Sequence, residues 1–279
     1  MSLSDLITIT KINVLTIADV PVKHPLKPMN AKVLLVGESW VSSSTHVKGF
    51  DFFSSSFYAT GGDFLISALQ KRDIQVTHLP GHLAAKDFPF ELRKLQAFDV
   101  VILSDIGANT LLLPPETFLE GKRMPNRLEL LKEYVKRGSG LVMAGGYLSF
   151  QGIYGAARYQ RSPVEEVLPV FILPTDDRVE KPEGVNPRVT NETHFITKGL
   201  EKEWPYVLGF NEVKAKEGSE TLAMLNDHPL LVVGTFGDGR SVAWTSDIGP
   251  HWCPREFVDW IGYGEIWARI IRWLCKDDQ

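Results

Sequence analysis

A tyrosine preceded by two glycines follows a short apolar run near the middle of the chain. Residues 141–147 have the sequence Leu-Val-Met-Ala-Gly-Gly-Tyr, which predicts a buried strand followed by a tight turn. Enzymes with a nucleophile elbow expose the attacking side chain at such a turn. That side chain would be Tyr147, and a phenol with an ordinary pKa of about 10 is a poor acyl-transfer nucleophile. Gly145 and Gly146 also suit a turn without a catalytic role, which is the simpler interpretation.

Residues 246–253, with the sequence Ser-Asp-Ile-Gly-Pro-His-Trp-Cys, contain the other candidates for catalysis. His251 is the best candidate for a general base, because it follows a predicted strand and lies near Asp247, which could orient its ring. Cys253 is a candidate nucleophile if a basic neighbour such as His251 lowers the pKa of its thiol. An inert, half-buried thiol beside Trp252 is the simpler interpretation of this cysteine.

Polar and aromatic side chains also follow other predicted strands. Ligands bind at the carboxyl ends of the strands in open parallel α/β sheets, so the loops at these ends supply candidates for ligand binding. The predicted ligand-binding residues are Glu38, Ser39, Trp40, His46, Asp105, Asn109, Gly145, Gly146, Tyr147 and Trp252. Glu38 is equally suited to capping a helix or pairing with a lysine, and Trp40 and Trp252 are suited to packing over the rim of a core.

Composition and charge exclude several functional classes. Among the 279 residues 44% are hydrophobic and 23% charged, which is typical of a globular protein with a large core. The net charge of −4 gives no basic surface for nucleic acid. No apolar run reaches the roughly 18 residues of a membrane span, and no signal-peptide pattern is present. With only two cysteines, a cytoplasmic protein without a nucleic-acid or membrane partner is predicted.

No cofactor and no metal site are predicted. The chain has no glycine-rich phosphate loop followed by Lys-Ser or Lys-Thr, and no dinucleotide-binding fingerprint. It also has no metal-type pair of cysteines, and its histidines are scattered.

Apolar strands alternate with helices from residue 32 onward. Such short runs between helices are what a parallel sheet buried on both faces requires. Strands are predicted over 33–36, 75–79, 100–103, 141–144 and 170–173, helices over 62–71, 127–137 and 264–276, and hairpin strands over 221–225, 230–236 and 240–245. The serine-rich segment between the first strand and the first helix is predicted as a long flexible loop, and residues 175–187 as a polar excursion. Residues 1–29 are interpreted as an N-terminal extension (an N-terminal arm), a linker or a segment upstream of the true start, and residues 30–279 as one domain.

Several motifs together resemble the class I glutamine amidotransferase-like superfamily. Within it the chain is similar to uncharacterised cytoplasmic proteins named "putative glutamine amidotransferase", which are themselves similar to ThuA-like proteins. The resemblance rests on the order of residues 33–40, 145–147, 168–170 with 176–178, 194–200 and 247–252. It implies a flavodoxin-like, three-layer α/β/α sandwich with a mostly parallel sheet, to which C-terminal hairpin strands are added.

The chain departs from the glutaminases of this superfamily at the residues that carry their chemistry. Those enzymes have Gly-x-Cys-x-Gly at the elbow and a His-x-Glu near the C-terminus. Here Tyr147 stands at the cysteine position, Ser149 at the second glycine, and Cys253 at the glutamate that should follow His251. The resemblance therefore implies the fold and the location of a pocket, whereas glutamine hydrolysis is not expected.

Three functions are compatible with these observations. The first is a domain that binds a small polar metabolite, such as a sugar or a carboxylate, in the superfamily pocket. The second is a hydrolase or amidotransferase with a relocated nucleophile, in which His251 activates Cys253. The third is a homo-oligomeric interaction protein whose exposed aromatic run packs against another subunit. This run comprises Phe50, Phe52, Phe53, Phe57 and Tyr58.

Overall fold

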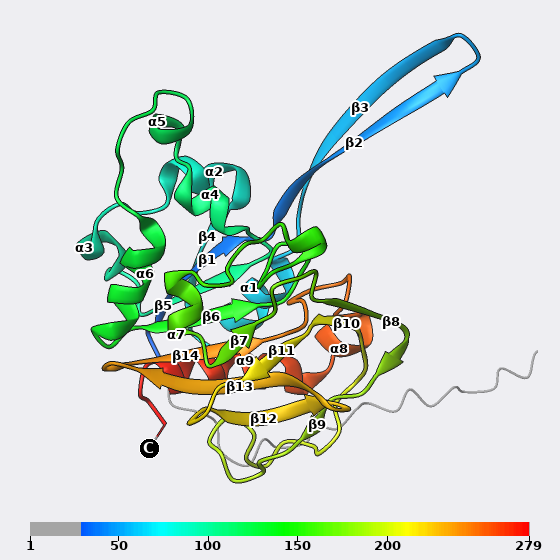
Figure 1. Ribbon diagram of the computed structural model, residues 1–279. Coiled ribbons are helices and arrows are strands. Elements are labelled where there is room, and N and C mark those ends of the chain that lie inside the picture. The colour runs from blue at the N-terminus through cyan, green and yellow to red at the C-terminus, as the bar shows by residue number, and fades with distance from the viewer. Residues whose placement is uncertain (1–28, 279) are drawn as a thin grey trace, which may run out of the picture.

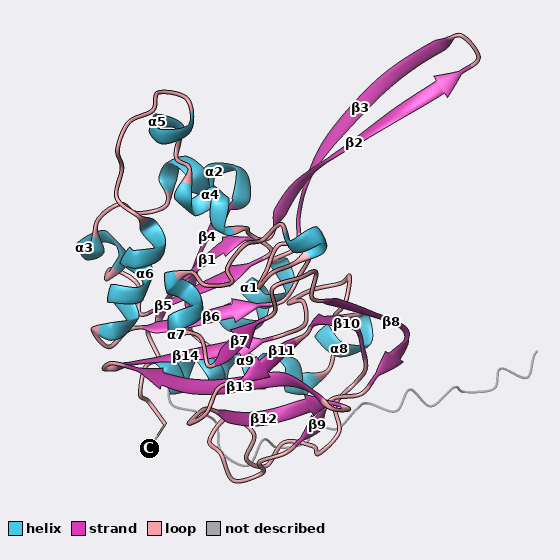
Figure 2. Cartoon of the chain, viewed as in Figure 1, coloured by secondary structure: helices cyan, strands magenta, loops and turns pink. Residues whose placement is uncertain are grey.

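An eight-stranded sheet forms the centre of the molecule (Figures 1 and 2). The computed structural model describes residues 29–278, so residues 1–28, and with them most of the predicted N-terminal segment, lie outside this range. The strand order is β4-β1-β5-β6-β14-β13-β12-β9. The first five strands are mutually parallel and the last three pair antiparallel. The parallel part has the 2-1-3-4-5 order of flavodoxin-like folds.

The sheet strands have the following bounds: β1 Lys32–Gly37, β4 Gln75–Pro80, β5 Val100–Ser104, β6 Gly140–Ala144, β9 Arg188–Val189, β12 Glu220–Leu225, β13 His228–Phe236 and β14 Gly239–Trp244. The helices are α1 Asp63–Gln70, α2 Gly81–Asp87, α3 Leu92–Leu95, α4 Ala108–Leu112, α5 Pro115–Phe118, α6 Arg127–Lys136, α7 Pro163–Val167, α8 Arg255–Val258 and α9 Ile261–Leu274, with a 3-10 turn over Ile153–Gly155. The strands predicted at 33–36, 75–79, 100–103 and 141–144 lie in the parallel part of the sheet, and its fifth parallel strand is β14, which was predicted as a hairpin strand. The other hairpin strands and the three long helices are also present.

Helices cover both faces of the sheet and form two hydrophobic cores. Alternate residues of β1 point to opposite faces, so Val33 and Leu35 pack in the core that contains α1, α8 and α9, whereas Leu34 and Val36 pack in the core that contains α2, α3, α4, α6 and α7. Burial on both sides explains why β1 is apolar at every position from Val33 onward. The predicted three-layer α/β/α sandwich is therefore confirmed.

The segment between β1 and α1 is not the predicted flexible loop. It forms two ten-residue strands, β2 Ser39–Lys48 and β3 Asp51–Thr60, which pair antiparallel without a bulge. We call residues 39–60 the arm, because this ribbon projects away from the body of the molecule (Figure 1). Serines of the two strands lie opposite each other, as in the contact of Ser43 Oγ with Ser56 Oγ at 2.8 Å. The serine-rich segments are therefore extended because they pair with each other, and not because they pack on a core.

Two further segments lie outside the central sheet. The predicted strand at 170–173 is β7 Val170–Ile172, which pairs with β11 Val213–Ala215. The polar excursion at 175–187 contains β8 Arg178–Val185, which pairs with β10 Val207–Asn211. Both small sheets are visible in Figure 2. Among residues 29–278, no helix is long and apolar enough to cross a membrane.

Candidate functional site

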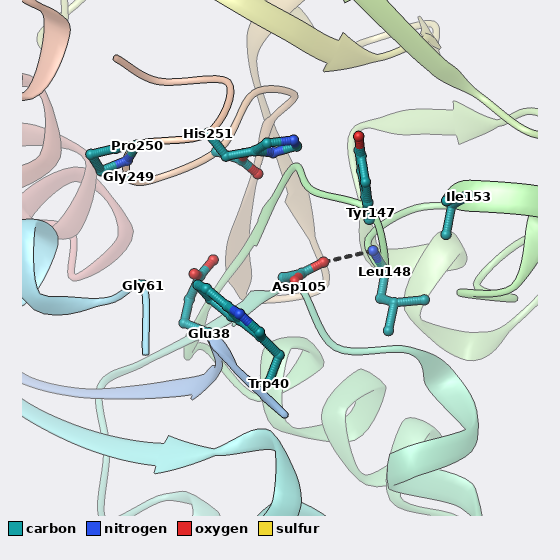
Figure 3. Close-up of a pocket in the computed structure, with 11 residues that line it drawn as sticks. Glu38, Trp40, Gly61, Asp105, Tyr147, Leu148, Ile153, Gly249, Pro250 and His251 are labelled. Carbon is teal, nitrogen blue, oxygen red and sulfur yellow. Dashed lines mark hydrogen bonds and ion pairs between the residues drawn. The ribbon is translucent and has the colours of Figure 1, made fainter. Parts of the chain in front are cut away.

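A cavity of about 500 Å³ opens at the carboxyl ends of the parallel strands (Figure 3). β4 and β5 lie on opposite sides of β1, so the strand order reverses at β1. The cavity lies at this reversal, which is the usual place for a ligand in such sheets. Glu38 and Trp40 lie on one side of the cavity, His251 and Tyr147 on the other, and Asp105 between them. The remaining lining residues are Gly61, Leu148, Ile153, Asp247, Gly249 and Pro250.

Glu38 and Asp105 occupy equivalent places at the ends of neighbouring strands. Each is the first residue after its strand, and each has a left-handed backbone, with φ of 49° and 46°. Glu38 N donates to Ser104 O at 3.0 Å, and Ser104 Oγ donates to Glu38 Oε1 at 2.5 Å. Left-handed residues other than glycine are costly and concentrate at functional sites. The backbone thus turns both carboxyl groups into the same space.

Burial gives Glu38 an unusual protonation state. Desolvation, followed by the charges of Asp247 and Asp105, raises the pKa of Glu38 from 4.5 to about 8. Burial also raises the pKa of Asp105, although the hydrogen bond that Leu148 N donates to its Oδ1 at 2.7 Å opposes the shift. Glu38 therefore keeps its proton at neutral pH and can donate it.

The glycine turn after β6 lies against both Asp105 and Asp247. A Cβ on Gly146 would lie 3.1 Å from Asp105 Oδ1 and from Asp247 Oδ1, so a side chain there would crowd both carboxyl groups, and the positive φ of 142° also favours glycine. Asn211 of β10 holds this turn, because its Oδ1 accepts from Gly146 N at 2.9 Å and its Nδ2 donates to Gly146 O at 3.2 Å. The same Nδ2 donates to Asp177 Oδ1 at 2.8 Å.

Tyr147 projects from this turn but is not an activated nucleophile. Its hydroxyl donates to Glu180 Oε1 at 3.1 Å, and the guanidinium of Arg178 lies 5.2 Å from its ring centre. Partial burial, together with Glu180, raises the pKa of Tyr147. Activation of a nucleophile requires an easily lost proton, so Tyr147 is not suited to attack. It lines the cavity as a hydrogen-bonding side chain.

His251 and Asp247 form a hydrogen-bonded pair beside Tyr147. His251 Nδ1 lies 2.7 Å from Asp247 Oδ2, which also accepts from Trp252 N at 3.0 Å. The bond to Asp247 raises the pKa of His251, while partial burial opposes the shift. The imidazole stacks on Trp252 at 5.4 Å and meets the edge of Tyr147 at 4.7 Å. A protonated carboxyl and an oriented imidazole can together bind hydroxyl groups and move a proton.

Comparison with known families matches residues 32–276 to the family described as "Putative glutamine amidotransferase". The chain belongs to this family. A cytoplasmic protein from Salmonella typhimurium is 40% identical over 87% of this chain and 98% of its own, with a TM-score of 0.84. A second, from Salmonella typhimurium LT2, is 42% identical over 87% of this chain and 99% of its own, also with a TM-score of 0.84.

A ThuA-like protein from Parabacteroides merdae has a similar fold. It is 11% identical over 90% of this chain and 91% of its own, with a TM-score of 0.54, so the likeness concerns the fold alone. The resemblance expected from the sequence is thereby confirmed. No curated protein matches the chain.

The structure brings together six of the site residues predicted for this amidotransferase-like chain. They are Glu38, Trp40, Asp105, Tyr147, Asp247 and His251. Gly146 lies beneath the carboxylates, while Gly145 is buried and donates its N–H to Trp244 O and Ser246 O. Trp252 is buried behind His251, with Nε1 donating to Glu180 Oε2 at 2.9 Å.

Other predicted residues lie away from the cavity lining. Ser39 Oγ accepts from Gly81 N at 2.7 Å, His46 stacks on Phe53 in the arm, and Asn109 is exposed in α4. Cys253 is fully buried, and burial raises its pKa. This thiol does not supply the accessible thiolate that a relocated nucleophile requires.

Sequence reasoning missed the residues that support the carboxylates. Gly61 leaves room for Glu38, because a Cβ there would lie 2.5 Å from Glu38 Oε2. Ser104, Glu180 and Asn211 were also missed. Ser104 directly follows the predicted strand at 100–103, in the loop that the sheet rule selected with Asp105, but it was not chosen as a site residue. Asn211 and Glu180 come from strands that the sequence did not predict. Within residues 29–278, no group of three or more His, Cys, Asp or Glu side chains is arranged to hold a metal ion.

Proposed function

We propose that this amidotransferase-like domain binds a small, uncharged, polyhydroxylated metabolite, such as a sugar or polyol, and does not hydrolyse glutamine. The observation that carries the proposal is the composition of the cavity lining. Glu38, Asp105 and Asp247 all line it, and none of the described lining residues is lysine or arginine. A carboxylate ligand would face the carboxylates of Asp105 and Asp247, and the one described lining side chain that can carry a positive charge, His251, is already bonded to Asp247. Hydroxyl groups, by contrast, are suitable donors to carboxylate oxygens.

The free oxygen atoms of the lining support this assignment. One oxygen of each carboxyl group is already engaged in the described structure: Oε1 of Glu38 with Ser104, Oδ1 of Asp105 with Leu148, and Oδ2 of Asp247 with His251. The second oxygen of each remains for a ligand. The ring of Trp40, 43% exposed, adds an apolar surface, and a cavity of about 500 Å³ lies in the usual range for small-molecule sites.

The side chains of the cavity support the proposal that glutamine is not hydrolysed. Of the described residues that line the cavity, none is cysteine, serine, threonine or lysine, and Tyr147 holds its proton more tightly than an ordinary phenol. We also propose a cytoplasmic location, which is supported by the two Salmonella relatives described as cytoplasmic proteins.

A thermal-shift screen tests the ligand class. The panel contains uncharged sugars and polyols, glutamine, simple carboxylates and amines. We expect at least one sugar or polyol to raise the Tm in a saturable manner, because a ligand that binds only the folded state stabilises it. Glutamine and the carboxylates should leave the Tm unchanged, and no ammonia should be released from glutamine.

Variants connect the response to the cavity. Asp105→Asn and Trp40→Ala should lose the shift, whereas Asp63→Asn, at an exposed position of α1, should retain it. Stabilisation by carboxylates but not by polyols would contradict the proposal. So would an equal response of the wild-type protein and Asp105→Asn.

A further inference from the structure

The arm has no protection along its edges. Natural sheets guard free edges with charges, prolines or bulges. Between Ser39 and Thr60 there is no proline and no register shift, and the only Lys, Arg, Asp or Glu residues are Lys48 and Asp51 at the tip. An isolated two-stranded hairpin is only marginally stable in water. The arm therefore has the character of an element that is covered in the functional molecule.

One face of the arm has a pattern that is symmetric about its middle. Its successive cross-strand pairs are Val41 with Tyr58, Ser43 with Ser56, Thr45 with Ser54, and Val47 with Phe52. The two end pairs are apolar and 48–74% exposed. The two middle pairs are hydroxyls, in contact at 2.8 Å and 3.1 Å. We call this surface the symmetric face.

We propose that the symmetric face is a dimer interface, and that its partner is the arm of a second copy of this chain, packed antiparallel across a two-fold axis. In a two-fold interface the same surface of both subunits meets, so this surface must be complementary to a copy of itself turned by 180°. Val47 and Phe52 of one arm then lie over Val41 and Tyr58 of the other, and hydroxyl pairs lie over hydroxyl pairs. This inference is independent of the proposed ligand.

Charge and size favour a second copy as the occupant. Lys48 and Asp51 cancel, so two arms carry no net charge that would keep them apart. A ten-residue strand spans roughly 33 Å, so each tip reaches the base of the other arm. At that base Tyr58 already contacts His82 of α2. The partner's tip would then lie next to α2, so that the interface includes residues beyond the four pairs of the symmetric face.

Sedimentation velocity of the full chain at micromolar concentration tests the proposal. The wild-type protein should sediment as a dimer of the 31.3 kDa chain. The double variant Phe52→Ser/Tyr58→Ser removes an apolar residue from each end of the symmetric face. Its dimer dissociation constant should increase by at least about tenfold, because buried aromatic residues dominate interface energies.

The matched control substitutes two aromatics of the opposite face, Phe53→Ser/Phe57→Ser, and should remain dimeric. Phe53 and Phe57 are 51% and 60% exposed, so the two variants remove similar apolar surface. Circular dichroism melting curves should match the wild-type curve for both variants, which excludes a folding defect. A monomeric wild-type protein would overturn the proposal. So would a dimer that the Phe53→Ser/Phe57→Ser variant disrupts and the Phe52→Ser/Tyr58→Ser variant leaves intact.

Discussion

Glu38 combines two features that are unfavourable in most positions of a protein. Its backbone is left-handed, with φ of 49°, and its carboxyl group is buried beside two other carboxylates. The hydrogen bond from Ser104 Oγ satisfies one of its oxygens, while Gly61 leaves space for the other. A residue held in this way keeps a proton available at neutral pH, which a solvent-exposed glutamate does not.

The raised pKa of Glu38 predicts a pH-dependent stability. Between its ordinary value of 4.5 and the folded-state value of about 8, the folded chain holds this proton and the unfolded chain has released it. The contribution of Glu38 to the free energy of unfolding therefore falls as pH rises through this window, and it no longer changes with pH outside the window. Glu38→Gln removes the titrating group. We expect the variant to gain up to about 1.4 kcal/mol over wild type for each pH unit in the window.

Urea denaturation near the two ends of this window measures the effect. Glu217→Gln, which changes an exposed carboxylate, serves as the control and should follow the wild-type curve. If Glu38→Gln also runs parallel to wild type, Glu38 titrates near its ordinary pKa and the proposed proton donor is lost.

At the scale of elements, the cavity depends on a strand outside the central sheet. β10 places Asn211 against the glycine turn, where its fully buried side chain bonds to both Gly146 and Asp177. Asp177 in turn accepts from Gln151 N and Gly152 N. The small β8–β10 sheet therefore fixes the segment that carries Tyr147.

Asn211→Ala tests this support. The substitution leaves the N–H of Gly146 and one oxygen of Asp177 with fewer partners in a buried place, so we expect a loss of roughly 2–4 kcal/mol in the free energy of unfolding. Asn109→Ala, at an exposed position of α4, should change it by less than about 0.5 kcal/mol. Equal denaturation midpoints for the two variants would mean that β10 does not hold the turn.

The central strands were predictable from the sequence, and the arm was not. β1, β5 and β6 are buried on both faces, so burial imposes an apolar residue at nearly every position. The arm contacts no core, and its alternating serines and aromatics resemble a flexible loop. β8 was missed because nearly all of its residues are exposed or only half-buried, so no apolar pattern marks the strand.

The site was predictable as a set of loops, but not as a set of contacts. The sheet rule selected the turns that contain Glu38, Asp105 and His251, because strand order alone brings them to one edge. The bond from Leu148 N to Asp105 depends on the tertiary path of the chain. His46 shows the converse, since it follows the same strand and yet lies on the arm.

At the scale of the whole molecule, the reactivity of Cys253 measures how readily the larger of the two hydrophobic cores opens. Its side chain is fully buried among residues of α8, α9 and the central sheet, and burial raises the pKa of its thiol. Cys275, just after α9, is half-buried, and burial raises its pKa to about 12. Neither thiol has the low pKa of a reactive cysteine.

Iodoacetamide labelling followed by peptide mass spectrometry checks this arrangement. Near neutral pH the native protein should react slowly, and Cys275 should react before Cys253, because Cys253 becomes accessible only when the core opens. Cys275→Ser isolates the Cys253 signal, whose rate should rise with added denaturant. Rapid labelling of Cys253 in the native state would instead restore the relocated-nucleophile interpretation.

The two ends of the arm lie next to each other at its base. Gly61 N donates to Glu38 O at 3.0 Å, so the chain leaves the body and returns to it at neighbouring points. Insertions are tolerated best where the ends of a segment lie close together. The part of the arm beyond Trp40, which lines the cavity, could therefore be shortened or rebuilt in relatives without moving the carboxyl groups of the site, and assembly could diverge during evolution while the ligand site is retained.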